Sequence, residues 1–226
     1  MNTFIRGGIF IFFVFLVVFV PNLFYSSDKI KSSRVIRIID GDTVELANGV
    51  HVRLLGVNAP EKGKEGYDEA KDYLRFLEGK EVMLEWTKEE KDKYFRDLRY
   101  VFYGKRFINR ELIMNGLVNE YIFKEDKYSD ELRGAENFAM KKDLGLWKRS
   151  SEICSDCIFL RLERDSVKIE NNCAVDCDLS GWMIRGRGRE AIDLDFFLEG
   201  KHYELESFNE TGDLFLWGRE GFVGMF

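Results

Sequence analysis

Four side chains suited to phosphate and metal chemistry lie in one short stretch of the sequence, at Asp42, Arg53, Asn58 and Glu61. A carboxylate and an amide oxygen are ligands that a hard cation accepts. A guanidinium group offers a planar pair of N–H donors to phosphate oxygens, and a further carboxylate can take a proton from water. This combination predicts a site that binds a cation beside a phosphate.

The elements around these residues are expected to bring them together. Three short strands are predicted, at residues 35–39, 43–46 and 52–57. Asn48-Gly49 is typical of a tight hairpin turn between the second and third strands, and Pro60 ends the third strand directly before Glu61. Most of the four side chains therefore stand at strand ends, where they can converge on one spot.

Three motifs in this order resemble the thermonuclease family, the staphylococcal nuclease-like proteins. They are Asp40-Gly41-Asp42-Thr43, then the segment Arg53–Glu61 that reads RLLGVNAPE, then Asp92-Lys93-Tyr94-Phe95-Arg96. The resemblance covers roughly residues 30–150 and implies an α+β fold, a five-stranded OB-fold barrel with a helical layer.

The resemblance also implies an activity and roles for the matched residues. The expected activity is hydrolysis of phosphodiester bonds in DNA or RNA, with 3′-phosphate products. The sequence shows no groove-reading helix or base-specific motif, so little sequence preference is expected. The catalytic residues would be Arg53, Glu61 and Arg96; the Ca²⁺ ligands would be Asp42, Asn58 and the Ala59 backbone carbonyl; the aromatic contacts to substrate would be Tyr94 and Tyr121, with Phe123 as a further candidate.

Three residues of the motifs depart from the family pattern. Asn58 stands where the family usually has an aspartate ligand, so one negative charge is missing and Ca²⁺ affinity should fall. Ala59 replaces a threonine found in some members but keeps the backbone carbonyl. Phe95 stands where glycine is frequent, and it would be strained if that position needs a positive φ. Asn58 leaves open an alternative function, a catalytically impaired adaptor that binds nucleic acid or protein.

Helical patterns follow the three strands. Apolar residues spaced along one face predict a helix over residues 67–77. Asn109 is expected to cap a second helix that ends at Gly116, and Ser129 a third that ends before Gly145.

Charge divides the 226-residue chain into two modules, expected at residues 28–150 and 151–226. Residues 29–149 carry 25 Lys and Arg and 23 Asp and Glu, whereas residues 150–226 carry 8 and 16. A phosphate backbone is repelled by an acidic surface, so nucleic acid should bind the first module.

The first 27 residues predict a membrane segment. Arg6 precedes an apolar run from Gly7 to Val20, and Leu23–Tyr25 extends it to about the length that spans a bilayer. No small-x-small cleavage site follows the run, because Phe24 and Tyr25 are bulky. We therefore expect an uncleaved, single-pass anchor with the remaining chain outside the cytoplasm; the alternative is a secreted protein.

The second module reads as an all-β sandwich. Short apolar runs between glycines predict strands at residues 158–162, 166–170, 182–185, 191–197, 203–205 and 214–217. The stretches Val167–Asn172, Asp178–Trp182 and Phe208–Leu216 resemble the lamin-tail domain family, which implies an immunoglobulin-like sandwich with a binding or targeting role and an unknown partner.

All four cysteines lie in the second module. Cys154-x-x-Cys157 and Cys173-x-x-x-Cys177 have a spacing close to that of zinc-binding pairs. Outside the cytoplasm the same residues would form two disulfides. A Cys-x-x-Cys disulfide is strained in a strand, so pairing across the two groups is favoured. Disulfides and a Zn²⁺ site both remain open from the sequence.

Overall fold

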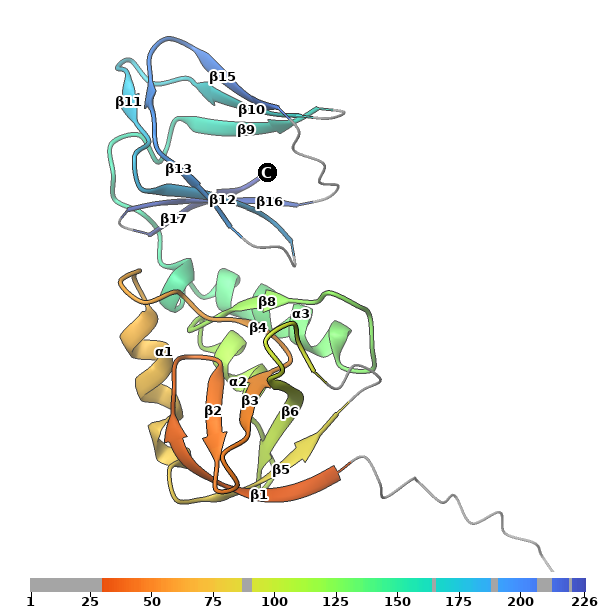
Figure 1. The fold of residues 1–226 in the computed structure, drawn as a ribbon. Coiled ribbons are helices and arrows are strands. Elements are labelled where there is room, and N and C mark those ends of the chain that lie inside the picture. The colour runs from red at the N-terminus through yellow and green to blue at the C-terminus, as the bar shows by residue number, and fades with distance from the viewer. Residues whose placement is uncertain (1–29, 87–90, 164–165, 188–190, 207–212, 220) are drawn as a thin grey trace, which may run out of the picture.

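The structure is a computed structural model that describes residues 30–86, 91–163, 166–187, 191–206, 213–219 and 221–226. Figure 1 shows two modules stacked on each other. The first contains strands β1–β8 and all of the described helices, and the second contains strands β9–β17. The second module lies over the side of the first where β4, β8 and α3 are found.

A five-stranded barrel forms the centre of the first module. Its strands are β1 (Ile30–Ile38), β2 (Thr43–Leu46), β3 (His51–Leu54), β5 (Glu81–Glu85) and β6 (Asp97–Tyr103). Neighbours pair antiparallel in the order β3-β2-β1-β5-β6, and a parallel pairing between β3 and β6 closes the barrel. The short β7 (Arg106–Phe107) pairs antiparallel with the end of β6. The predicted five-stranded barrel is therefore confirmed.

The strand predicted at residues 52–57 is divided in two. β3 ends at Leu54, and β4 (Gly56–Asn58) leaves the barrel to pair with β8 (Asn119–Tyr121). Gly56 has a φ of 72°, a left-handed conformation that only glycine adopts without cost. This bend turns Asn58 away from the barrel sheet and places it on the separate β4–β8 ribbon.

Three helices cover the barrel: α1 (Tyr67–Leu74), which continues as a 3₁₀ turn over Arg75–Leu77, α2 (Ile108–Met114) and α3 (Ser129–Lys141). The predicted caps were wrong, because neither Asn109 nor Ser129 caps its helix. Asn109 is instead fully buried, where its side chain accepts a hydrogen bond from Val101 N and donates one to Leu55 O. It fixes the chain that leads into β4 against β6.

The second module is entirely β among its described residues. Its strands are β9 (Ile158–Leu162), β10 (Ser166–Asn171), β11 (Cys177–Asp178), β12 (Trp182–Gly186), β13 (Ile192–Leu194), β14 (Phe197–Leu198), β15 (His202–Glu206), β16 (Leu214–Gly218) and β17 (Gly221–Met225). They form the sheets β15-β10-β9, β13-β12-β16-β17 and β11-β14. The apolar faces of the two larger sheets share a core that includes Val167, Ile169, Ile184 and Leu216.

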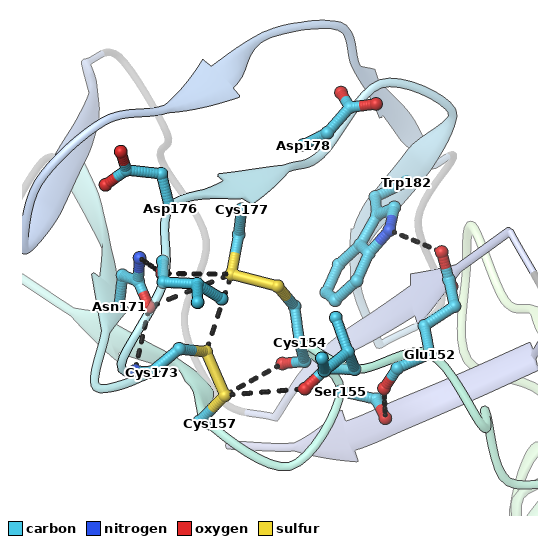
Figure 2. The surroundings of a disulfide bond; sticks show 12 residues. Glu152, Cys154, Ser155, Cys157, Asn171, Cys173, Asp176, Cys177, Asp178 and Trp182 are labelled. Carbon is cyan, nitrogen blue, oxygen red and sulfur yellow. Dashed lines mark hydrogen bonds between the residues drawn. A yellow bond between two sulfur atoms is a disulfide. The ribbon is translucent and has the colours of Figure 1, made fainter.

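Two disulfides join the cysteines, which confirms one of the two states left open and shows that the alternative, a Zn²⁺ site, was wrong. Cys154 bonds Cys177 and Cys157 bonds Cys173, the pairing across the two groups that was favoured. A zinc site needs deprotonated thiols as ligands, and a disulfide removes them. Figure 2 shows both bonds beside Asn171, whose side chain accepts a hydrogen bond from Cys173 N and donates one to Val175 O.

The predicted membrane anchor, residues 1–27, lies outside the described residues. Within the part of the chain that the structure describes, no helix combines the length and the hydropathy needed to cross a bilayer.

Candidate active site

One large cavity in the first module gathers every residue predicted to act on substrate or metal. Its volume is about 1010 Å³. The predicted site residues that line it are Asp42, Arg53, Asn58, Ala59, Glu61, Tyr94, Arg96 and Tyr121. They come from the end of β1 and the start of β2, from β3 and β4, from the segment before β6, and from β8. The cavity thus draws on all three sequence motifs at once.

Asp42 is a buried carboxylate at the base of this cavity, with only 7% of its surface exposed. One oxygen accepts a hydrogen bond from Thr43 Oγ1 at 3.0 Å, and the other accepts one from Ala59 N at 2.8 Å. Burial raises the pKa of Asp42 to about 6; Arg53 opposes this rise and the neighbouring Asp40 carboxylate adds to it. The positive charge of Arg53 therefore balances the negative charge of ionised Asp42 only in part.

Arg53 lies between the two predicted ligand side chains. Its Nη2 atom is 3.1 Å from Asp42 Oδ2 and donates to Asn58 Oδ1 at 3.2 Å, while Nη1 donates to Leu54 O at 2.7 Å. The side chain is 12% exposed, so the guanidinium is held rigidly. Asn58 directs its side-chain oxygen at Arg53, as an aspartate there could do.

The donor set fits a hard cation such as Ca²⁺. Asp42 and Asn58 offer side-chain oxygens, and the Ala59 backbone is tied to Asp42 through its N–H group. Asp40, which the sequence analysis did not single out as a ligand, also lines the cavity, and its carboxylate accepts a hydrogen bond from Asp42 N. A cation would supply the positive charge that the buried Asp42 carboxylate lacks. The signal for Asp40 was present in the first motif, which contains two carboxylates.

Arg96 is held in the cavity by a tight turn. Its Nε donates to Asp92 Oδ2 at 2.6 Å and its Nη1 donates to Thr43 Oγ1 at 3.2 Å. Asp92 also accepts the N–H groups of Tyr94 and Arg96, and although burial acts to raise its pKa, these bonds and the Arg96 guanidinium lower it. Thr43 and Asp92 were not predicted as site residues. Asp92 holds the Arg96 side chain, and Thr43 connects Arg96 to Asp42.

The turn that presents Arg96 forces Phe95 into a left-handed backbone conformation, with a φ of 63°. This confirms the concern that the position needs a positive φ, which a bulky residue adopts at a cost. Arg96 nevertheless keeps its bonds to Asp92 and Thr43. The strain therefore remains in the backbone of Phe95, and the guanidinium stays in place.

Glu61 lies on an exposed loop at the edge of the cavity, between Ala59 and α1. Its backbone carbonyl accepts a hydrogen bond from Lys64 N at 2.9 Å, and Gly66 begins α1 with a φ of 84°. Exposure leaves the Glu61 carboxylate accessible to water, which a general base requires.

Aromatic side chains border the cavity. Tyr94 is 67% exposed and Phe123 is 77% exposed, which is unusual for large apolar groups. Lys93 and Arg96 lie over the ring of Tyr94. Together with Tyr121 these rings provide surfaces on which unstacked bases could pack beside the arginines.

Comparison with known proteins identifies the class to which this fold and cavity belong. Residues 51–149 match the family model described as "Staphylococcal nuclease homologue". The chain belongs to this family of phosphodiester-hydrolysing nucleases.

Individual relatives give the same result. The chain is 34% identical over 131 residues to a thermonuclease of Staphylococcus hyicus, which covers 52% of this chain and 76% of that protein. It is 35% identical over 130 residues to a thermonuclease of Staphylococcus intermedius, covering 53% and 77%. It is 30% identical over 138 residues to endonuclease YncB of Bacillus subtilis, covering 55% and 65%. The family match ends at residue 149, before the second module.

Proposed function

We propose that this protein is a Ca²⁺-dependent nuclease that cleaves DNA or RNA with little sequence preference. The observation that carries the proposal is the meeting of Asp42, Arg53, Asn58, Glu61 and Arg96 around one cavity. Surface ion pairs would not require these residue types to converge from four separate segments of the chain. Membership of the nuclease family supports the same reaction.

In the proposed mechanism, each side chain has a separate task. Glu61 accepts a proton from a water molecule whose oxygen attacks the phosphorus atom. Arg53 and Arg96 donate hydrogen bonds to the phosphate oxygens, which gain negative charge in the transition state. Bound Ca²⁺, held by Asp42, Asn58 and the Ala59 carbonyl, would add positive charge beside those oxygens.

The bond to the leaving 5′ oxygen then breaks, and that oxygen takes a proton from solvent. The phosphate stays on the 3′ end of the product. Tyr94 and Tyr121 hold the neighbouring nucleotide by stacking, which does not depend on the identity of the base.

A second candidate function is a nucleic-acid- or protein-binding adaptor. The observation that favours it is Asn58, whose neutral amide oxygen accepts a bond from Arg53 where a charged ligand would bind a cation more strongly. An adaptor would keep salt-sensitive binding of nucleic acid without turnover.

The two functions are separated by cleavage assays on the full-length chain, kept in a mild detergent because of its apolar first residues. Single-stranded DNA, double-stranded DNA and RNA are each incubated with Ca²⁺ or with EDTA. We expect cleavage that EDTA abolishes and that Arg96→Ala and Glu61→Gln reduce by about 100-fold or more.

Matched controls are available outside the catalytic set. Arg110→Ala removes an arginine that pairs with Glu131 away from the cavity, and Glu65→Gln makes the same change as Glu61→Gln four residues along the exposed loop. Both controls should retain nearly full activity. Folded protein that binds DNA but cleaves none at any Ca²⁺ concentration would support the adaptor instead.

We further propose that the second module is a lamin-tail-like, immunoglobulin-like domain that binds a partner, and that the chain is anchored in a membrane with both modules outside the cytoplasm; the alternative is secretion. Two disulfides support an oxidising location, because cytoplasmic thiols are kept reduced. The resemblance of Val167–Asn172 and Asp178–Trp182 to the lamin-tail family supports the first proposal.

The location is tested in cells that express the full-length chain. Protease added to intact cells should digest the protein, and alkylation of denatured protein should modify the four cysteines only after reduction. Protection from the protease, or four thiols that react without reduction, would contradict the proposed location. Full-length protein recovered from the membrane fraction distinguishes an anchor from a shortened, secreted form.

A further inference from the structure

An arginine from the second module reaches into the first and is completely enclosed there. Arg185 lies on β12 and only 1% of it is exposed. Its Nη2 donates to the Glu136 carboxylate of α3 at 3.1 Å, and its Nη1 donates to the backbone oxygen of Glu120 in β8 at 3.2 Å. The Phe215 and Trp217 rings pack against its guanidinium.

These contacts complete the open edge of the β4–β8 ribbon. The two strands pair only with each other in the described sheets, so the backbone groups on the outer edge of β8 need other partners. Glu120 N donates to Glu136 Oε1 at 3.0 Å, and Glu120 O accepts from Arg185. Glu136 and Arg185 therefore bond to β8 where a third strand would otherwise pair. The ion pair between Arg185 and Glu136 holds these two side chains to each other.

The ribbon held in this way carries residues of the active-site cavity. Val57 pairs with Glu120, Asn58 with Asn119 and Gly56 with Tyr121. Asn58 and Tyr121 both line the cavity. The cavity side of the ribbon thus presents Asn58 and Tyr121, while its opposite edge is held by the second module.

The second module makes another contact near the cavity. Asp193 of β13 pairs with Lys64 at 3.0 Å, and Lys64 N donates to the backbone oxygen of Glu61. This pair is exposed, so its contribution is small by comparison with the buried contact of Arg185.

We propose that Arg185 is a positioning residue of the nuclease site, which holds the β4–β8 ribbon so that Asn58 and Tyr121 have their working positions. This inference rests on the proposed function for the roles of Asn58 and Tyr121. The second module is then part of the catalytic unit, in addition to any partner it binds.

The test compares the full-length protein with Arg185→Met, in which a side chain of similar length lacks donors. Arg149→Met is the matched control, because it makes the same substitution at the same interface and removes the hydrogen bond from Arg149 Nη1 to Val223 O without touching β8 or Arg185. Ca²⁺ binding is measured by titration calorimetry with CaCl₂. Hydrogen–deuterium exchange is measured in peptides that contain residues 56–58 and 119–121.

We expect Arg185→Met to raise the Kd for Ca²⁺ by about fivefold or more and to speed exchange in both peptides, while Arg149→Met changes neither by more than about twofold. Arg185→Lys should give an intermediate result, since one ammonium group cannot reproduce the geometry of the two guanidinium hydrogen bonds to Glu120 O and Glu136. If Arg185→Met does not fold, Arg185→Lys decides by the same two measurements, because it keeps the charge beside Glu136.

The inference would be overturned if a folded Arg185 variant kept either the Kd for Ca²⁺ or the exchange rates of the parent protein. A parent protein that binds no Ca²⁺ and cleaves nothing would instead refute the proposed function. In that case the exchange rates alone decide whether Arg185 holds the ribbon.

Discussion

At the scale of single residues, the proposed cation site depends most on Asn58. It supplies an oxygen at the place of a charged ligand, and Arg53 already bonds to that oxygen. We expect Asn58→Asp to tighten Ca²⁺ binding by on the order of tenfold, because ligand charge sets affinity at such sites. Titration calorimetry with CaCl₂ measures the Kd for Ca²⁺ of the variant and of the parent protein. Asn48→Asp, the same change in the exposed β2–β3 turn, should leave the affinity unaltered.

The backbone at Phe95 stores strain that glycine would release. A left-handed conformation costs a residue with a side chain about 1–2 kcal/mol. Phe95→Gly should therefore be more stable than Phe95→Ala by about 1 kcal/mol in urea unfolding, although glycine ordinarily destabilises a chain. Comparing glycine with alanine removes the effect of losing the ring. Equal stabilities would mean that the φ of 63° carries no cost.

The predicted site residues proved easier to find than the residues that hold them. Side chains that touch substrate or metal must have particular chemical groups, so Asp42, Glu61 and Arg96 were visible in short motifs. Thr43 and Asp92 lie in the same motifs, but their part is to hold Arg96. Asp92 bonds to Arg96 within one turn, whereas Thr43 bonds to it only because β2 approaches that turn in three dimensions. No local pattern encodes that approach.

At the scale of elements, the first motif requires a glycine because of α1. A Cβ atom on Gly41 would lie 2.6 Å from Ala70 Cβ and 2.8 Å from Ala59 Cβ, too close for either to remain in place. Gly41→Ala should cost about 1–3 kcal/mol of unfolding free energy and weaken Ca²⁺ binding by displacing Ala59.

The matched control for Gly41→Ala is Gly134→Ala in α3. Gly134 is exposed and has no atom within 4 Å of the added Cβ, so this change should stabilise the helix by about 1 kcal/mol. Denaturant unfolding of both variants shows directly whether each substitution raises or lowers the free energy of unfolding. A stabilising Gly41→Ala would show that the turn and α1 can move apart freely.

Strand and helix positions followed from the sequence wherever burial alternated regularly. The strands predicted from residue 35 to residue 54 and most strands of the second module were found close to their predicted positions, although β1 begins earlier, at Ile30. The bend at Gly56 was not, because an apolar run through residues 52–57 looks the same whether the chain stays in one sheet or leaves it for β8. Asn109 was misassigned as a cap because its buried partners, Val101 and Leu55, are distant in the sequence.

At the scale of the whole molecule, the interface between the modules makes stability depend on pH. Burial raises the pKa of Glu120 to about 7, and the adjacent Glu136 carboxylate adds to the rise, whereas Arg187, Arg133 and Arg185 oppose it. The folded protein therefore binds more protons than the unfolded chain between pH 4.5 and 7. The contribution of the neutral Glu120 carboxyl group to stability is complete below that range and is lost as the pH rises through 7.

We accordingly expect the free energy of unfolding to fall between pH 5 and 8, and to fall less steeply in Glu120→Gln, which stays neutral throughout. The difference between the two proteins should be on the order of a few kcal/mol. Urea unfolding at several pH values measures it. Parallel pH profiles for the two proteins would show that Glu120 does not titrate in this range.

The interface itself could not have been foreseen from the sequence. Charge counts separated the chain into two modules, and nothing in the sequence indicated that Arg185 would pair with Glu136 or that Trp147 would pack against Trp217 and Phe222. Such contacts join segments of two modules, each of which forms its strands and helices from its own local sequence. They are defined only when both modules have formed.

The nested order of the two disulfides keeps the chain covalently joined when a protease cuts inside the first part of the second module. The bond between Cys157 and Cys173 lies inside the loop closed by Cys154 and Cys177. A protease that cuts anywhere between residues 158 and 176 therefore leaves at least one covalent bridge across the break. The nuclease module and the rest of the sandwich would stay tethered after such a nick, and the damaged molecule could keep working in a protease-rich environment.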